Sequence, residues 1–222
     1  MRFLVRAFSA LAVALMSSIT WSGEDGWQLE KEKDGIQIYS RAVDGWEIHE
    51  VRGVARIDAR LSSVVAAIND VAAIHELTDI VAHSEIRQRA SDSRYQIYST
   101  MKMPWPVSNR DILNQREIKQ DPTTRVVTIT DTAIQDPNPP KPDYVRIVKS
   151  RQQWTLTPIA EGGVQVETRL LSDPAGPMPS SLINSMSVNT PLKTLSKLKE
   201  LVQRPAYAQA TLPFIKEAPA KP

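Results

Sequence analysis

The sequence of 222 residues contains no cysteine and only three histidines. Without cysteine the chain can form no disulfide and offers no thiolate nucleophile or thiolate metal ligand. The spacing of His75 and His83 does not match a pair of metal ligands on neighbouring turns of one helix. Glycine-rich phosphate loops and Gly-x-Ser-x-Gly motifs are also missing from the sequence. We therefore expect no metal, no cofactor and no catalytic residues, and thus a protein that is not an enzyme.

No apolar run of the sequence is long enough to cross a bilayer comfortably as a helix. The run "AFSALAVALMSSI" has 13 residues and follows Arg2 and Arg6, which is the pattern of a secretory signal. Small residues at Thr20 and Ser22 permit cleavage after Ser22. We predict that residues 1–22 are a cleaved signal peptide and that the protein is periplasmic or secreted, in a Gram-negative envelope. An uncleaved membrane anchor is the alternative.

The chain beyond that segment has no excess of either charge. Removing Arg2 and Arg6 from the 27 basic residues leaves 25, which equals the number of acidic residues. A protein without net charge has no broad positive field to attract a polyanion. We therefore expect no nucleic-acid partner.

Turn signals and hydrophobic periodicity divide the chain into one domain, residues 24–203, and a tail. Asp34-Gly35 predicts a hairpin, and Gly53 inside the strand candidate 46–57 suggests a bulge or bend. Residues 61–77 have helical spacing, in one helix or two short ones, with Asp58 as a possible N-terminal cap. Further strands are expected at 80–90, 94–103, 109–119, 124–134, 144–157 and 163–171, and an amphipathic helix at 180–203.

The tail, residues 204–222, holds four prolines and no sustained periodicity. It is predicted to be mostly disordered or to lie on the domain as an arm. Pro191 inside the last helix is either a hinge or a static kink. Many antiparallel strands and one long amphipathic helix predict an α+β fold, in which a curved sheet wraps around the C-terminal helix. One helix does not fill such a sheet, so an internal pocket is expected.

Three stretches of the sequence are similar to motifs of one known family. "MPWPVSNRDIL" resembles the Pro-Leu-Ser-x-Arg-Asp motif of the START lipid-transfer domains. "YVRIVKSRQQWTLTPI" at 144–159 resembles the family's Tyr-Val-Arg strand, and "DPAGPMPSSLINSM" at 173–186 resembles the segment that leads into its last helix. The resemblance covers most of residues 27–203. It implies the helix-grip fold, with a hydrophobic tunnel between the antiparallel sheet and the C-terminal helix.

The resemblance also indicates which residues would surround a ligand. In sterol-carrying members, an arginine at the position of Arg116 lies in the tunnel opposite a carboxylate on the preceding strand. That strand has no carboxylate here, so Tyr98, Thr100 or a ligand would have to pair with Arg116. Alternatively, Arg116 points to solvent and pairs with Glu117 or Asp131. Arg146 lines the tunnel or braces the proline-rich loop 135–143, and Asp111 anchors the turn after Pro104-Trp105-Pro106 to the backbone or to a basic neighbour.

Further ligand contacts are expected from the next strands and from the last helix. Trp154 shares a face with Arg146 if no bulge intervenes. One inward stripe of the last helix is predicted to face the ligand: Leu182, Met186, Asn189, Leu192 and Leu195.

The sequence thus predicts non-catalytic binding, and transfer, of a lipid or other hydrophobic small molecule, with transient membrane contact. Two alternatives come from other classes. One is a protein-interaction module with a collapsed cavity. The other is a small hydrolase or cyclase of the same superfamily, which would need two polar groups converging in the tunnel.

Overall fold

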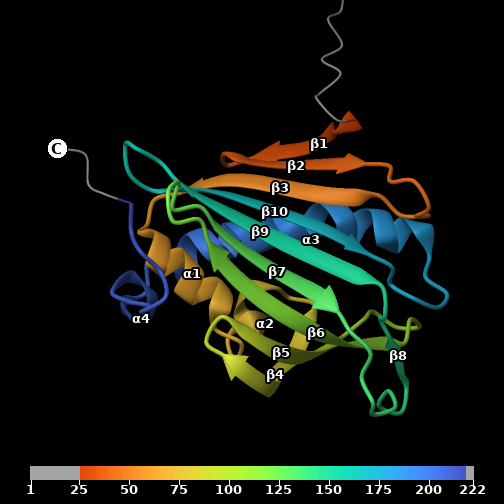
Figure 1. Ribbon diagram of the computed structural model, residues 1–222. Coiled ribbons are helices and arrows are strands. Elements are labelled where there is room, and N and C mark those ends of the chain that lie inside the picture. The colour runs from red at the N-terminus through yellow and green to blue at the C-terminus, as the bar shows by residue number, and fades with distance from the viewer. Residues whose placement is uncertain (1–25, 219–222) are drawn as a thin grey trace, which may run out of the picture.

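The computed structural model describes residues 26–218, which form one curved sheet and four helices (Figure 1). The predicted signal peptide, residues 1–22, lies outside the described residues. The strands are β1 (Gln28–Lys33), β2 (Ile36–Arg41), β3 (Glu50–Ile57), β4 (Val81–Ser91), β5 (Arg94–Met101), β6 (Asn109–Gln120), β7 (Val127–Ala133), β8 (Tyr144–Arg146), β9 (Ser150–Pro158) and β10 (Val164–Ser172). The helices are α1 (Leu61–Asn69), α2 (Ile74–Leu77), α3 (Ser180–Leu201) and α4 (Pro205–Ala208).

The sheet is antiparallel along its whole main path, in the order β1-β2-β3-β10-β9-β7-β6-β5-β4. It curves around α3, while α1 and α2 connect β3 to β4 and lie on the same side (Figure 1). This is the predicted arrangement. No helix among the described residues has the length and hydrophobicity needed to cross a membrane.

The C-terminal half of α3 packs into the core against the first strands of the sheet. Leu195 and Leu198 are fully buried, and Leu195 lies directly over Gly53 of β3. A Cβ at Gly53 would come within 2.8 Å of the Leu195 side chain, so glycine is required for this close approach. Of the predicted bulge or bend at Gly53, the bulge is wrong, because β3 keeps regular register with β2 and β10 there. What Gly53 provides is space for the helix.

The predicted strand 144–157 is two strands. β8 pairs in parallel with the beginning of β6, whereas β9 pairs antiparallel with β7 and β10. At the break between them, the amide of Ile147 donates a hydrogen bond to the Asp111 carbonyl. Arg146 and Trp154 therefore do not share a face of one strand.

Residues 61–77 form two short helices, and the first is capped from a distant part of the chain. The residue before α1 is Arg60, whose side chain makes no capping hydrogen bond, so the expected cap by Asp58 is wrong. Instead, the Glu217 carboxylate accepts hydrogen bonds from the backbone amides of Leu61 and Ser62, at 3.1 and 3.0 Å. These amides have no partner within the helix, so Glu217 takes the role of an N-cap residue.

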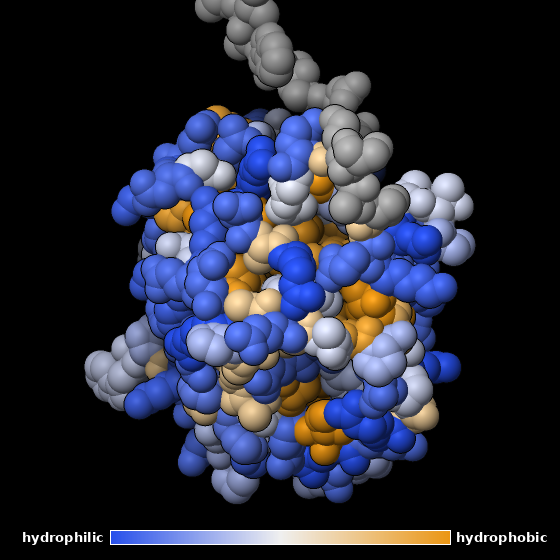
Figure 2. Space-filling model, turned by 90° about the vertical axis from the view of Figure 1, so that its left-hand side faces the viewer, coloured by the Kyte–Doolittle hydropathy of each residue, from blue (hydrophilic) through white to orange (hydrophobic). Residues whose placement is uncertain are grey.

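The described part of the tail, residues 204–218, lies against the domain as an arm. Tyr207 and Ile215 are buried, and Leu212 and Phe214 pack against the core. The Tyr207 hydroxyl donates to Asp70, and Gln120 bonds the backbone of Lys216 in both directions. Apart from the single turn of α4, the segment forms no regular element, and apolar burial and polar contacts hold it on the domain. Figure 2 shows this end of the molecule as largely hydrophilic, with hydrophobic residues visible in between.

Replacing Glu217 by alanine is expected to lower the free energy of unfolding by about 1 kcal/mol, since the cap of α1 is lost. Urea denaturation followed by circular dichroism measures the change. Glu161→Ala is the control, because Glu161 is exposed in the turn between β9 and β10. Equal stability of the two variants would contradict a capping role for the arm.

Candidate functional site

A cavity of about 280 Å³ lies between the concave face of the sheet, α3 and the pair α1 and α2. Its wall is predominantly apolar. Helices α1 and α2 contribute Ile68 and Leu77, α3 contributes Ile183 and Met186, and the sheet contributes Ile112 and Trp154. A largely apolar cavity with a few polar groups is typical of small-molecule sites. The expected internal pocket is present and has not collapsed.

Arg116 faces this cavity from β6 and forms a buried ion pair with Asp131 of β7. Its Nε and Nη2 donate to the two carboxylate oxygens of Asp131 at 2.8 and 2.7 Å, and its Nη1 donates to the Ile68 carbonyl. Burial alone would lower the pKa of Arg116, but the attraction of Asp131 outweighs it and the pKa is raised. The arginine is thus charged and turned inward, and its partner lies on the following strand.

Arg110 faces the same side of β6 and is almost completely buried. Its guanidinium donates to three carbonyl oxygens, those of Ser108, Pro174 and Ala175. Burial lowers the pKa of Arg110 from its ordinary value. Pro174 and Ala175 belong to the segment that leads into α3, so Arg110 ties the beginning of β6 to the approach of that helix.

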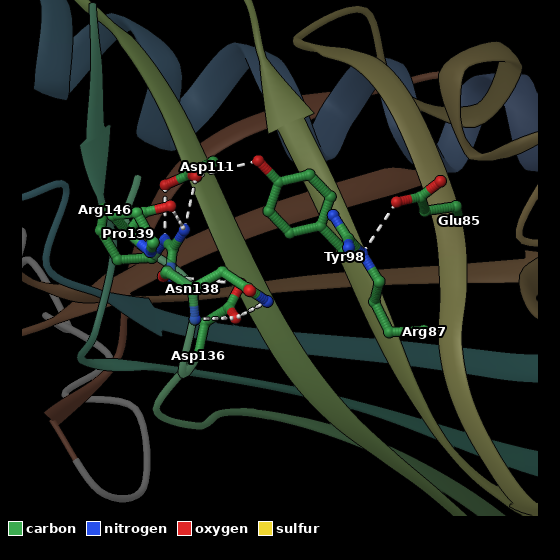
Figure 3. A network of polar contacts seen from close by, with 8 residues as sticks. All are labelled: Glu85, Arg87, Tyr98, Asp111, Asp136, Asn138, Pro139 and Arg146. Carbon is green, nitrogen blue, oxygen red and sulfur yellow. Dashed lines mark hydrogen bonds and ion pairs between the residues drawn. The ribbon is translucent and has the colours of Figure 1, made fainter. Parts of the chain in front are cut away.

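Asp111 points to the opposite face of the sheet, where the proline-rich loop covers it (Figure 3). Its carboxylate accepts hydrogen bonds from Arg146 at 2.6 and 2.8 Å and from the Tyr98 hydroxyl at 2.9 Å. Burial opposes ionisation of Asp111, but the bonds from Arg146 and Tyr98 outweigh it, so the pKa of Asp111 is lowered. Burial and the bond to Asp111 raise the pKa of Tyr98 to about 12.

Arg146 extends this network to the loop between β7 and β8. It forms an ion pair with Asp136 at 3.3 Å and donates to the carbonyls of Asn138 and Pro139 (Figure 3). Of the two roles considered for Arg146, the structure shows the bracing of the proline-rich loop. The motif around Asp111 is likewise anchored by a basic neighbour, as expected.

Two residues predicted on β5 face away from the cavity. Tyr98 and Thr100 are buried on the side of the sheet that carries Asp111, and neither lines the cavity. Their expected orientation is wrong because Arg116 pairs in register with Tyr95, so the inward set of β5 is Ile97, Ser99 and Met101. Arg146 is also absent from the cavity wall, for the reason given above.

The residues of α3 that line the cavity lie on a different side of the helix from the predicted stripe. Met186 lines the cavity, but Leu182 does not, Asn189 is exposed and bonds Lys31, and Leu195 lies in the core. The inward positions are Ile183, Met186, Ser187, Thr190, Pro191 and Thr194. Hydrophobicity is a poor guide to these positions, because half of them carry hydroxyl groups, whereas Leu192 and Leu195 pack against or in the core.

Met186, Trp154 and Arg116 are the predicted site residues that the structure brings together around the cavity. Their contact with a ligand stays a prediction. Ile183 and Asn114 also line the cavity and were not among the predicted site residues. Alternation along β6 from Arg110 through Ile112 to Arg116 was the signal that could have found Asn114.

Breaking the buried ion pair is expected to destabilise the protein more than removing it. Arg116→Met leaves the Asp131 carboxylate buried without its partner, which costs about 3–5 kcal/mol. The double variant Arg116→Met/Asp131→Leu removes both charges and is expected to be more stable than Arg116→Met alone. Chemical denaturation of the single and double variants completes a double-mutant cycle. Additive effects in the cycle would contradict direct coupling of the two side chains.

Acid is expected to weaken the domain through Asp111. The lowered pKa of Asp111 in the folded state means that its contribution to stability is present above the pKa of the unfolded chain. The contribution is lost as the pH falls from about 5 through the folded pKa. We expect the stability of Asp111→Asn to be lower at neutral pH and to depend less on pH in this acidic range. Unfolding curves at several pH values measure both, and an unchanged pH dependence would refute the assignment.

Comparison with known proteins identifies the family. The START domain family model matches residues 10–207. A STAR-related lipid transfer protein of Xanthomonas axonopodis has a solved structure that is 35% identical, with a TM-score of 0.74, covering 81% of this chain and all of the other. Human StAR-related lipid transfer protein 5 shares the fold at 18% identity, with a TM-score of 0.74 over 82% of this chain and 88% of that chain.

Sequence relatives extend across similar lengths. An uncharacterized protein of Pseudomonas aeruginosa is 29% identical over 92% of this chain and 100% of its own. The phosphatidylcholine transfer protein of Rattus norvegicus is 24% identical over 80% of this chain and 84% of its own. The family model and the Xanthomonas structure each span most of the chain, and the observed sheet and helix are those of the helix-grip fold. This chain is therefore a member of the START domain family.

Proposed function

We propose that this protein binds a lipid or another hydrophobic small molecule in the cavity and carries it between membranes. The observation that supports the proposal is the largely apolar cavity of about 280 Å³ between the sheet and α3. A bound apolar surface would be removed from water, which is favourable by about 25 cal/mol for each Å². The names of the related lipid transfer proteins are consistent with this role.

Exchange of the ligand would require part of the wall to move, and α3 is suited to this. Its C-terminal half is anchored in the core by Leu195, Leu198 and Leu201, which are all buried. Its N-terminal half is less buried and contributes Ile183 and Met186 to the cavity wall. Pro191 stands between the halves and lacks the amide that would continue the helical hydrogen bonds. We assign Pro191 as the hinge about which the first half opens at a membrane surface.

We further propose that the protein acts without catalysis and works outside the inner membrane of a Gram-negative cell. Asp131 is the one carboxylate in the described lining of the cavity, and Arg116 occupies both of its oxygens. Asp131 is thus engaged by an ion pair, and His49, the histidine of the described lining, is exposed to solvent. The location rests on residues 1–22, which have the pattern of a secretory signal.

The proposal is tested by incubating the purified protein with liposomes that carry labelled lipids. We expect the protein to extract at least one lipid class, and organic extracts of the purified protein to yield a co-purifying lipid in mass spectrometry. Failure to extract any class, together with extracts that repeatedly lack lipid, would overturn the proposal. Full-length protein in the membrane fraction of cells, in place of a shortened periplasmic form, would overturn the proposed export.

Filling part of the cavity is expected to weaken binding. Met186→Trp places a large side chain in the wall and excludes part of the ligand, so affinity should fall about tenfold or more. Asn184→Trp is the matched control, because Asn184 is exposed on the same helix. Lipid extraction from liposomes measures both variants. Equal extraction by both would argue against the cavity as the binding site.

A further inference from the structure

The sulfur atoms of the described residues all belong to the cavity wall. The chain has no cysteine, and two of its six methionines, Met1 and Met16, precede the described residues. The other four line the cavity: Met101, Met103, Met178 and Met186. Any oxidation of sulfur in this part of the chain therefore changes the wall of the proposed binding site.

These methionines lie around the part of the wall that is assigned to open. Met101 ends β5, shortly before Met103, and pairs in register with Arg110. Arg110 holds two carbonyls of the segment before α3, and the same segment contains Met178. Met186 belongs to the first half of α3, which moves in the proposed exchange. Ligand exchange would thus expose the sulfur-bearing side chains first.

The four side chains are neither sealed in the core nor fully on the surface. Only 8% of Met103 is exposed, whereas Met101, Met178 and Met186 are half-buried. A hydrogen peroxide molecule is little larger than water, and the oxidation of a sulfur-containing side chain follows its exposure. Peroxide can therefore reach at least the three half-buried methionines.

We propose that the cavity methionines are a site of oxidative modification, and that their conversion to sulfoxides releases the ligand. The oxidant is a hydroperoxide. The sulfur lone pair forms an S–O bond with one peroxide oxygen, the O–O bond breaks, and the hydrogen on the transferred oxygen passes to the departing hydroxide, which leaves as water. The thioether is oxidised and the peroxide is reduced, so no further reactant is needed. This inference rests on the proposed function and adds the regulation of the same site.

A sulfoxide would make the wall polar where its strongest donors are already engaged. The S=O group is a hydrogen-bond acceptor on a side chain that was apolar. Arg110 and Arg116 donate to oxygens of the protein, and the Ser187 hydroxyl donates to the Ile183 carbonyl. A buried acceptor without a donor is costly, so water would enter the oxidised cavity in place of an apolar ligand. Affinity for an apolar ligand is expected to fall about tenfold or more.

The proposed location supplies a setting for this modification. The periplasm is an oxidising compartment. Methionine sulfoxide can be reduced again by dedicated reductases, so the change is reversible. The modified wall would then act as a switch between a ligand-holding and a ligand-releasing state.

The test measures the binding of Nile red, an uncharged apolar dye, to the purified protein before and after treatment with hydrogen peroxide. Mass spectrometry of proteolytic peptides locates the added oxygen atoms. We expect sulfoxides at Met101, Met178 and Met186 before Met103, because Met103 is the most buried. Dye affinity should fall about tenfold or more. Bound dye should slow the oxidation, because it covers the same side chains.

A variant with leucine at the four positions keeps the apolar volume of the wall and removes its sulfur: Met101→Leu/Met103→Leu/Met178→Leu/Met186→Leu. It is expected to bind the dye as the wild type does and to keep its affinity after peroxide treatment. If this variant does not fold, Met178→Leu/Met186→Leu replaces it. The double variant should lose less affinity on oxidation than the wild type.

Met186→Gln imitates the oxidised side chain, since glutamine is of similar length and ends in a polar group. It is expected to weaken dye binding without any peroxide. Leu182→Gln is the matched control, because Leu182 lies on the same half of α3 but outside the cavity wall. Equal weakening by the two substitutions would contradict a specific effect of polarity in the wall.

The outcomes separate the modification from the carrier function. Sulfoxides that form without a loss of dye affinity would overturn the proposal. An equal loss in the fourfold leucine variant would place the damage elsewhere and overturn it as well. So would cavity methionines that resist a peroxide treatment sufficient to oxidise free methionine. If the untreated protein binds neither the dye nor any liposome lipid, the carrier function itself fails, and the release of a ligand on oxidation fails with it.

Discussion

The architecture depends on two adjacent side chains at the beginning of β6 that point to opposite faces of the sheet. Arg110 turns inward and holds the carbonyls of Pro174 and Ala175, just before α3. Asp111 turns outward and holds Arg146, which in turn binds the proline-rich loop (Figure 3). Because successive residues of a strand alternate in direction, one dipeptide can secure both layers around the sheet. The position of α3 over the cavity and the covering of the convex face both follow from this.

The cavity is a consequence of how the helix meets the sheet. The Leu195 side chain packs directly against Gly53, which has no Cβ. The C-terminal half of α3 can therefore lie close to the sheet. The first half of the helix, which carries Met186, instead borders a space that the sheet encloses and no protein side chain fills. Arg116 and Asp131 can be buried in the same wall because each side chain neutralises the charge of the other. The Oδ1 of Asn114, on the same strand as Arg116, lacks such a partner.

Much of the fold could be predicted from sequence because its signals are local. Asp34-Gly35 correctly indicated the hairpin of β1 and β2, and the periodicity of residues 180–203 indicated the last helix. The predicted orientation of a side chain was wrong where it depended on the neighbouring strand. Tyr98 was expected inward because a partner for Arg116 was sought on the preceding strand, whereas register places Asp131 opposite Arg116 on the following one. Hydrophobicity indicated Leu195 correctly as buried, but it could not distinguish the core from the cavity wall.

The sequence by itself determined the fold class, most of the order of strands and helices, and the family to which its three motifs belong. Those properties follow from spacing, turn residues and breakers that act over a few positions of the chain. Tertiary structure alone decided that Glu217 caps a helix beginning at Leu61, that the proline-rich tail is an arm, and that Asn114 stands unpaired in the wall. Each of these depends on contacts between segments far apart in the chain, and their energies depend on the burial that only the folded state creates.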